Sequence, residues 1–552
     1  MLTKQTILKK TLQVGGSTIF SRALGLIREV LMANYLGAGP LAEAFITAYK
    51  IPNSLRKIFA EGALSVAFIP TFVTIAKKDG KEQINKLMSL ALILFEGALL
   101  IICLLAIWKA DWVIRLVAPG WFSIDKVTLI PATGIQFIDV FTEGFNSIWS
   151  VFVDKSVEPT WYVAHAISFL RILMSFILFL STSALIAGVL QSMHHFFVPA
   201  FSPVLLNIVY IFGLFVCVTF KLSPIYLCLF IIGGGIIQLI LHIIVYVKLG
   251  FGLGKIDYKT WQYFKDVWRK FLPCLFSMSV MEIYLFIDTS FGSYLPGAIA
   301  HLYYANRFMQ IPLGVIATAL STILLPHFSR IGVYAPKRLG FYLLESSKLI
   351  FWTMIPISLV MAMVSHKIFF TLFLSEKFTL FDVHQTSIIF IAFLYGLVFF
   401  SLNKILLNLF YALHETKIPM YISIIATVSN FIFSYLLMKI WGAYGIAMAT
   451  TLCGVIQTLL FVFFLQYSFD FILYIKRFFE FLFYCSIQWL VFGSLFLVCY
   501  LGIIKLLSKI HLSTFLLTKI GFWLWFLPLA SILFLGLYKS RRFFGIHLYF
   551  LD

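Results

Sequence analysis

Charged side chains cluster in an early stretch of the chain that is otherwise apolar. Residues 21–70 read "SRALGLIREVLMANYLGAGPLAEAFITAYKIPNSLRKIFAEGALSVAFIP". The ionisable residues of this stretch are Arg22, Arg28, Glu29, Glu43, Lys50, Arg56, Lys57 and Glu61. An arginine at the centre of a bilayer costs about 3 kcal/mol on insertion scales, so such groups face a polar interior or a partner. The cluster predicts a water-accessible chamber at membrane depth that binds a charged ligand.

The first of these segments has a polar face and an apolar face. At the helical angle of about 100° per residue, Arg22, Arg28 and Glu29 fall within an arc of about 120°, and Leu24 points away from it. One acid cannot neutralise Arg22, Arg28 and Arg56 together, so we expect surplus positive charge inside the chamber. A structural ion pair between Glu29 and a neighbouring arginine is the open alternative.

A second basic face lies in the segment "HLYYANRFMQIP" at 301–312. Tyr303, Asn306, Arg307 and Gln310 share one side of a helix by i,i+3 and i,i+4 spacing. Guanidinium groups match phosphate oxygens two at a time and stay charged when they lose water. The two basic faces therefore favour a diphosphate on a lipid tail over a neutral sugar or a cationic drug.

Local pairing is the simpler interpretation for some of the other polar residues. Lys57 and Glu61 are four residues apart and can pair on one helix, and Glu43 can lie near the outer surface. Lys404 and Asn408 share a helix face, where polar contacts between helices are the simpler explanation.

The elements that position these residues are membrane helices. The chain has 552 residues, 61% hydrophobic and 12% charged, which predicts an all-α polytopic membrane protein. The net charge of +19 would suggest a nucleic-acid partner in a soluble protein, but here basic residues concentrate in loops that fix topology. Their distribution predicts that both termini are cytoplasmic and that no nucleic acid binds. The seven cysteines lack CxxC spacing and are predicted to be small hydrophobic residues.

We expect about fourteen transmembrane helices. They span residues 10–37, 41–77, 84–108, 164–191, 198–220, 223–248, 264–294, 298–330, 342–365, 383–412, 418–439, 442–468, 478–504 and 515–537. Pro52 is expected to interrupt the second. Six helices form an N-lobe (1–250), six form a C-lobe (251–470), and two lie at the C-terminus with a cytoplasmic tail (471–552).

Internal similarity supports the two lobes. "VLQSMHHFFVPAF" (189–201) resembles "LFYALHETKIPMY" (409–421), and "NYLGAG" (34–39) resembles "SYLPGA" (293–298). Both lobes begin on the same side, which indicates a parallel repeat. Parallel repeats around a midplane site are typical of alternating-access carriers.

A membrane enzyme is the weaker alternative. The chain has no GxSxG, HExxH or P-loop motif. The outer insertion at 121–162, predicted to be an interfacial element, contains acids that could serve glycosyl transfer: Asp125, Asp139, Glu143, Asp154 and Glu158. It has no paired base or metal motif, so we expect a transporter without a resident cofactor.

Three stretches resemble one family. "SRALGLIREVLMANYLGAG", "KIPNSLRKIFAEGALSVAFIP" and "YYANRFMQIPLGVIATALSTILLP" are similar to the MurJ/MviN lipid II flippases of the multidrug/oligosaccharidyl-lipid/polysaccharide exporter superfamily. The resemblance implies fourteen helices, two lobes and a V-shaped central cavity. It implies a monomeric flippase of the bacterial inner membrane that moves undecaprenyl-diphosphate-linked peptidoglycan precursor, lipid II, to the outer leaflet by alternating access, in cell wall biogenesis and cell shape. Export of another diphosphate-linked lipid glycan, or cation/drug antiport within the superfamily, stays open.

The resemblance also assigns roles to residues. Those implied to bind the diphosphate are Arg22, Arg28, Glu29, Arg56 and Arg307. Those implied at the gate or cavity are Glu43, Glu61, Asn306 and Gln310. A sodium site of some members matches Asp288, Asn430 and Thr450, but Ser434 stands in place of a second acid, which argues against sodium binding. No resident cofactor is expected, and sodium or the membrane potential is left open as the driving force. The last two helices are implied to form a groove for the lipid tail.

Overall fold

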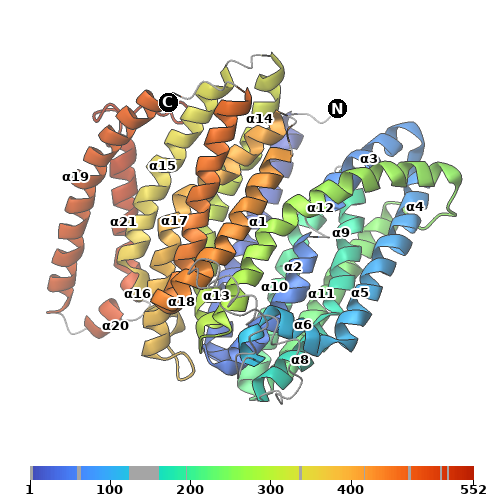
Figure 1. Ribbon diagram of the computed structural model, residues 1–552, viewed down its shortest axis with the longest axis horizontal. Helices are drawn as coiled ribbons and strands as arrows, with labels where there is room; N and C mark the ends of the chain where they lie inside the picture. The colour runs from blue at the N-terminus through green and yellow to red at the C-terminus, as the bar shows by residue number, and fades with distance from the viewer. Residues whose placement is uncertain are drawn as a thin grey trace, which may run out of the picture. The chain divides into compact units, whose positions relative to one another are not determined.

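The computed structural model describes most of the chain as helices (Figure 1). The described residues are 4–58, 64–122, 161–193, 195–334, 338–413, 415, 417–469, 474–509, 513–518 and 521–552. Within these ranges there are helices and no β-strand, which confirms the predicted all-α class. Glu61 and nearly all of the 121–162 insertion lie outside the described residues, so the structure does not test what the sequence predicts for them.

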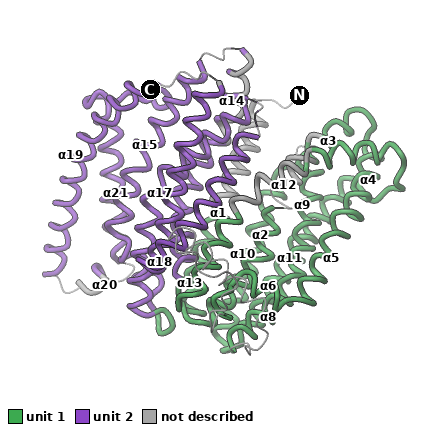
Figure 2. The backbone as a smooth tube through the Cα atoms, viewed as in Figure 1, with its two compact units in different colours: residues 1–300, 375–378 green, residues 301–374, 379–552 purple. Residues whose placement is uncertain are grey.

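Unit 1 consists of residues 1–300 together with the short segment 375–378 (Figure 2). Its helices are α1 (Lys4–Leu36), α2 (Pro40–Arg56), α3 (Leu64–Lys78), α4 (Gly80–Ala91), α5 (Gly97–Trp108), α6 (Ala110–Val117), α8 (Trp161–Leu173), α9 (Phe176–Ser192), α10 (Phe197–Thr219), α11 (Pro224–Lys248) and α12 (Tyr258–Gly292). A π-helical turn, η2 (Leu92–Glu96), joins α4 to α5, and a 3-10 turn, η3 (Pro119–Phe122), follows α6. Within this unit α1 packs on α10, α2 on α8, and α9 on α11.

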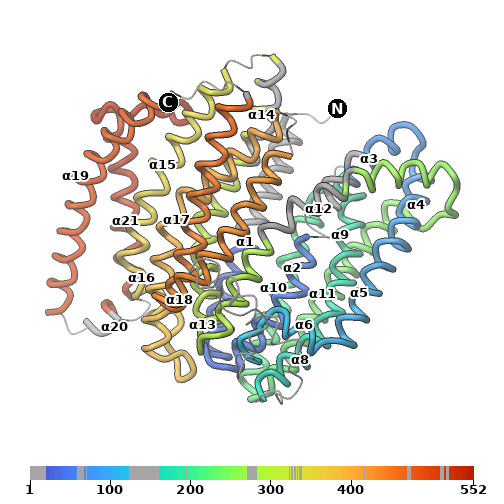
Figure 3. The backbone as a smooth tube through the Cα atoms, in the orientation of Figure 1, coloured from blue at the N-terminus to red at the C-terminus, as the bar shows by residue number. Residues whose placement is uncertain are grey.

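Unit 2 consists of residues 301–374 and 379–552. Its helices, the first of which begins in unit 1, are α13 (Ala298–Pro312), α14 (Thr318–Tyr334), α15 (Leu339–Met363), α16 (Ser365–Phe373), α17 (Leu380–Ala412), α18 (Lys417–Phe469), α19 (Ile475–Leu507), α20 (Ser513–Thr518) and α21 (Gly521–Ser540). A second π-helical turn, η4 (Leu313–Ala317), joins α13 to α14. Figure 3 follows the chain to its end, where α19 and α21 pack together and the short α20 connects them.

The two units do not coincide with the predicted lobes at the junction. Helix α12 follows the predicted boundary at residue 250 but belongs to unit 1, because it packs on α3 and α4. The internal repeat and the lobe limits stay predictions.

The polytopic class is confirmed, whereas the count of fourteen helices is not. Nine helical stretches of the described residues are long and apolar enough to cross a membrane. Helices α1, α2 and α12, which contain the charged residues of interest, are not among them. Helix α18 combines the helices predicted at 418–439 and 442–468. They meet at Gly442, whose φ of 58° lies in the left-handed region that favours glycine.

The second predicted helix, 41–77, corresponds to α2 and α3, and residues 59–63 between them lie outside the described residues. The interruption expected at Pro52 is wrong, because α2 continues through Pro52 to Arg56. A proline removes one backbone hydrogen bond but does not have to end a helix. The short helices α6 and α16 are additional elements that the sequence reasoning does not predict.

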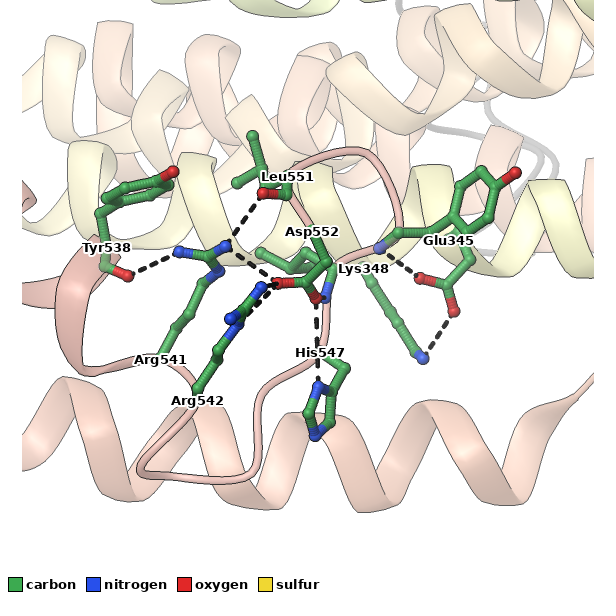
Figure 4. A network of polar contacts seen from close by, with 10 residues as sticks. Glu345, Lys348, Tyr538, Arg541, Arg542, His547, Leu551 and Asp552 are labelled. Carbon is green, nitrogen blue, oxygen red and sulfur yellow. Dashed lines mark hydrogen bonds and ion pairs between the residues drawn. The ribbon is translucent and has the colours of Figure 1, made fainter.

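The C-terminal tail folds onto its own unit through charged contacts (Figure 4). Asp552 accepts hydrogen bonds from Arg541 at 2.9 Å and from Arg542 at 3.0 Å. The backbone N–H of Tyr549 donates to Glu345 of α15 at 3.2 Å. Burial alone would raise the pKa of Asp552, but hydrogen bonds from the Leu548 N–H and the two arginines lower it overall. The tail therefore connects the end of α21 to the start of α15.

Candidate functional site

Arg28 of α1 occupies the best-defined polar environment of unit 1. Its Nη2 lies 2.5 Å from Glu29 Oε1, and its Nη1 donates to Asn207 Oδ1 of α10 at 2.9 Å. The guanidinium carbon also lies 5.0 Å from the centroid of the Tyr210 ring. The Arg28 side chain is 12% exposed and that of Glu29 is 5% exposed. The guanidinium plane is therefore oriented by an acid, an amide and an aromatic face.

The packing of α1 on α10 produces this arrangement. Asn207 and Tyr210 are three residues apart and thus share the face of α10 that meets α1. Asn207 Nδ2 donates back to the Ser21 carbonyl at 3.1 Å, which fixes the amide so that its oxygen points at Arg28. Tyr210 donates its hydroxyl to Met32 Sδ at 3.3 Å. Arg28 is thus positioned before any ligand arrives.

The ion pair between Arg28 and Glu29 is the alternative that the sequence analysis left open, and the structure forms it. The pair does not remove the basic character of the face, because Arg22 on the same helix is exposed. Arg56 of α2 is half-buried, and Asn53 Oδ1 accepts from its Nη2 at 3.1 Å. Unit 1 thus brings Arg28 and Glu29 together, while Arg22 and Arg56 lie in other surroundings.

Glu43 of α2 is buried and accepts a hydrogen bond from the backbone of α13. It is 5% exposed, and its Oε1 accepts a hydrogen bond from the backbone N–H of Ile299 at 2.9 Å. Ile299 lies in the first turn of α13, where backbone N–H groups have no helical acceptor and favour a negative charge. Glu43 therefore caps α13 from α2, and its predicted gate role stays a prediction.

A second line of polar contacts joins α2 to α12 within unit 1. Ser54 donates to Glu282 Oε2 at 2.5 Å, and Lys57 Nζ lies 3.0 Å from Glu282 Oε1. Further toward the C-terminal end of α12, the Thr289 hydroxyl accepts a hydrogen bond from Lys50. The i,i+4 partner suggested for Lys57, Glu61, lies outside the described residues, so that pair stays a prediction; the described residues add an ion pair between Lys57 and Glu282 of α12.

Arg307 of α13 lies in unit 2 with the neighbours predicted for it. Its Nη2 donates to the Tyr303 hydroxyl at 3.3 Å, and its guanidinium carbon lies 5.0 Å from the Tyr303 ring centroid. Gln310 donates to Asn306 one turn earlier. The predicted shared face is therefore present, with both contacts made between residues four apart on one helix.

Polar residues of α17 connect helices, as the simpler interpretation proposed. Lys404 Nζ donates to Thr318 Oγ1 at 2.8 Å, and Asn408 Nδ2 donates to the Ser321 hydroxyl at 2.7 Å. Thr318 follows η4, the π-helical turn after Pro312. These contacts hold α17 against α14, the helix that follows α13 and η4 in the chain.

The residues suggested for sodium divide between the units. Asp288 is buried in unit 1, whereas Asn430 and Thr450 are in unit 2, where Asn430 Nδ2 donates to Thr450 Oγ1 at 3.2 Å. Asn430 Oδ1 and Ser434 Oγ are buried without a hydrogen-bond partner among the described residues. In that part of the chain no group of three His, Cys, Asp or Glu side chains could hold a metal ion.

Sequence reasoning missed Asn207, Tyr210 and Glu282. Each is a polar or amphipathic residue within a long apolar helix, and that isolation was the available signal. Their partners lie 179 residues away for Asn207 and 225 residues away for Glu282, so spacing along one helix could not find them.

The fold and these buried basic and polar groups define a class, the polytopic α-helical membrane transporters. Among solved structures, one titled "Lipid II flippase MurJ, inward closed conformation" matches with a TM-score of 0.73 and 25% identity, over 96% of this chain and 98% of that chain. A multidrug resistance MATE family transporter of the MOP superfamily, in an inward-facing conformation, matches with a TM-score of 0.62 and 14% identity, over 80% and 93%, which shows a shared fold.

Sequence comparisons define the family. A protein of Haemophilus influenzae named "Probable lipid II flippase MurJ" is 31% identical over 456 residues, 80% of this chain and 83% of that protein. The family profile "Lipid II flippase MurJ" matches residues 32–521. This chain belongs to the MurJ family. The matched range includes Arg56 and Arg307 but begins after Arg28, so the role of Arg28 depends on the structure.

Proposed function

We propose that this chain is a lipid II flippase of the bacterial inner membrane. It is a multi-pass transporter rather than an enzyme. The observation that supports the proposal is the family match across residues 32–521, together with the structural likeness to a MurJ protein over 96% of the chain. Its place is therefore in peptidoglycan synthesis.

The proposed substrate contact is made by arginine. Arg28 is already oriented by Asn207 and Tyr210, so it can meet an anion without first losing side-chain freedom. Guanidinium donors match the oxygens of a diphosphate. We assign Arg28 in unit 1 and Arg307 in unit 2 as contacts to the diphosphate of the undecaprenyl-linked precursor. Alternating access then moves the precursor from the inner to the outer leaflet.

The competing transport functions lack a supporting observation. The likeness to the MATE transporter is one of fold, at 14% identity. A cationic drug would be repelled by Arg28 and Arg307, whereas another diphosphate-linked glycan would satisfy the same charges. The experiment must therefore identify which lipid is moved and also measure its movement across the membrane.

The test is complementation in bacteria whose own lipid II flippase is depleted. The measured quantity is lipid II at the outer leaflet, detected with a membrane-impermeant reagent that cleaves it. The chain should restore outer-leaflet lipid II, and Arg28→Ala or Arg307→Ala should reduce it by at least about tenfold, since a hydrogen bond to a charged group contributes about 1.5–3 kcal/mol.

The control is Arg171→Ala, because Arg171 is an exposed arginine of α8. It should leave the outer-leaflet lipid II unchanged. Normal export by both arginine variants would overturn the residue assignment. Failure of the wild-type chain to restore lipid II, although it is inserted in the membrane, would overturn the function.

The driving force is a separate part of the proposal. Buried oxygens of Asn430 and Ser434, together with the Thr450 hydroxyl, are neutral oxygen donors of the kind a sodium ion accepts. If sodium binds, these residues of unit 2 supply neutral ligands and the ion supplies positive charge. Sodium titration of the purified chain against Asn430→Ala tests this, and equal binding by both would contradict it.

Topology and oligomeric state complete the proposal. The basic residues that follow α3, α11 and α21 support cytoplasmic termini. We infer that the chain acts as a monomer. Cysteine accessibility at the termini and particle mass in nanodiscs are the corresponding measurements; periplasmic labelling of either terminus, or a dimer mass, would contradict these statements.

A further inference from the structure

Glu96 is an acidic residue within an apolar membrane span that the transport site does not use. The span Gly80–Trp108 has a mean hydropathy of 2.9, the highest of the nine stretches found in the described residues. Glu96 lies 12 residues before Trp108 and 16 after Gly80 (108 − 96 and 96 − 80), or about 18 and 24 Å at 1.5 Å per residue. Its carboxyl group therefore lies in the hydrocarbon region of the bilayer.

The carboxyl group is held by a neutral hydroxyl of a neighbouring helix. Ser181 of α9, which is fully buried, donates to Glu96 Oε2 at 2.7 Å. The neighbouring Thr182 hydroxyl donates to the Leu178 carbonyl of its own helix at 2.9 Å. Glu96 Oε1 is buried without a hydrogen-bond partner among the described residues. An ionised carboxylate needs donors at both oxygens, so this environment suits the neutral acid better than the anion.

Other buried acids of the described helices have different partners. Glu29 pairs with Arg28 at 2.5 Å, Glu282 with Lys57 at 3.0 Å, and Glu345 with Lys348 at 2.7 Å. Each of these three acids therefore has a cation to stabilise its charge, whereas the hydrogen bond to Glu96 comes from a neutral hydroxyl.

The elements packed against η2 are α4, α5 and α9, together with α12 through Trp268 and Phe271. The described charged side chains of α12 around these rings are Lys265, Asp266 and Arg269, and no ion pair joins them to Glu96 among the described residues. The charged residues of α4 are at its other end, where Lys86 bonds to Glu82 and Asp257 and Lys81 bonds to the Leu249 carbonyl. Helix α5 contributes the Cys103 thiol, which donates to the Met174 carbonyl at 3.4 Å. Helix α9 contains no ionisable side chain. These neighbours leave the Glu96 carboxyl group without a described counter-charge.

The backbone around Glu96 is also irregular. Glu96 is the last residue of η2, and single π-helical turns inside α-helices are frequent at functional sites. The preceding residue, Phe95, packs its ring 4.8 Å from that of Phe271 on α12. Gly97 follows, and a side chain there would meet open space. The turn thus fixes Phe95 against α12, while the Glu96 carboxyl group faces Ser181 of α9.

We propose that Glu96 is a proton-binding site within the N-terminal unit. The carboxylate takes up one H⁺ to become the neutral acid and returns it without any other bond change. Ionisation would place a negative charge on η2 that the Ser181 hydroxyl alone must stabilise, so it would alter the packing of η2 on α9. The site is separate from Arg28 and does not depend on lipid II being the substrate.

The test is infrared spectroscopy of the full chain in nanodiscs, titrated from about pH 5, where an ordinary carboxyl group is already mostly ionised, to about pH 10, above the range of strongly shifted carboxyl groups. The difference between wild type and Glu96→Gln should contain one protonated-carboxyl C=O band, which is lost as the pH rises. In Ser181→Ala the band should shift in frequency, because the serine hydroxyl no longer donates to the carboxyl group.

Glu82→Gln, at an exposed acid on the same helical stretch, is the matched control and should leave the band unchanged. Absence of the band at the lowest pH would show that Glu96 stays ionised and would overturn the proposal. A band that persists unchanged through the whole titration would overturn it as well, because a permanently neutral acid exchanges no proton. Both readouts need no lipid II, so their failure is distinct from failure of the proposed function.

Discussion

Arg28 and Arg307 are assigned the same chemistry but have different surroundings. Arg28 is positioned from another helix, by the amide of Asn207 and the ring of Tyr210, and it touches the acid beside it. Arg307 contacts Tyr303 one turn earlier on its own helix. The first arrangement depends on tertiary packing of α1 on α10, whereas the second belongs to α13 and moves with it.

This difference explains what each arginine can contribute. A side chain oriented from two helices has lost its rotamer freedom before the ligand binds, which favours affinity. A side chain held within one helix keeps its contacts when that helix moves, which suits an element that changes position during transport. The comparison predicts that Arg28 is the more sensitive position to changes in side-chain shape.

Among the substitutions that test this comparison, the largest effect should come from replacing Arg28 with lysine and a smaller one from the same change at Arg307. Arg28→Lys keeps the charge but cannot reach Asn207 and Glu29 with a planar fork, so we expect outer-leaflet lipid II to fall about tenfold or more. Arg307→Lys should lose less, because one hydroxyl contact is replaced. The depletion assay measures both, with Arg171→Lys as control. An equal loss at the two positions would contradict the inference that Arg28 is more sensitive than Arg307 to side-chain shape.

A smaller effect should follow removal of the positioning residue. Asn207→Ala removes one acceptor while Arg28 keeps Glu29, so lipid II affinity should fall about fivefold, corresponding to about 1 kcal/mol. Asn207→Ser, which keeps an oxygen, should restore part of it. Asn408→Ala, another amide that bonds a neighbouring helix in unit 2, is the control. If Asn207→Ala leaves the affinity for lipid II unchanged, the inference that Asn207 positions Arg28 is contradicted.

The smallest expected effect is a pH-dependent weakening of the contact that Asp257 makes between α12 and α4, away from both arginines. Asp257 caps α12, and its pKa is lowered first by the Thr260 hydroxyl and then by the Thr260 N–H, Gln83 and Lys86. A carboxyl whose pKa is lowered by folding stabilises the structure above its unfolded value of about 4, and this contribution is lost as the pH falls through the folded value.

The contact between α4 and α12 should therefore be intact at about pH 6 and weaken below about pH 4. Hydrogen exchange of residues 80–86 and 257–262, corrected for the intrinsic rate at each pH, measures it. Asp257→Asn should lose the pH dependence. Equal protection of both segments at about pH 6 and about pH 3 in the wild type would contradict the prediction, while the comparison of the arginines would stand.

Helix type and polar faces could be predicted from the sequence, because both are local. The face of Tyr303, Asn306, Arg307 and Gln310 follows from spacing alone, and the structure forms contacts within it. The break between the helices of α18 was expected within a few residues of Gly442. Periodicity and glycine conformations act over a few residues, so one sequence is sufficient to find them.

Partners on other helices could not be predicted. Glu29 pairs with Arg28, but the partners of Arg28 and Lys57 on α10 and α12 depend on how distant helices pack. The hydrogen bond by which Glu43 caps α13 joins residues 256 positions apart, so spacing along α2 could not predict it. Glu96 could not be identified from the sequence as a proton-binding residue. That inference depends on the hydrogen bond from Ser181 of another helix and on the second carboxyl oxygen, which has no donor among the described residues.

The central claim is that oriented guanidinium groups bind the diphosphate. The most direct test is native mass spectrometry of the purified chain with lipid II, in which wild type, Arg28→Ala, Arg307→Ala and Arg171→Ala are compared at equal lipid concentration. The account predicts bound lipid II for wild type and Arg171→Ala and a loss of at least about tenfold for the other two variants. Undiminished binding by both Arg28→Ala and Arg307→Ala would contradict it.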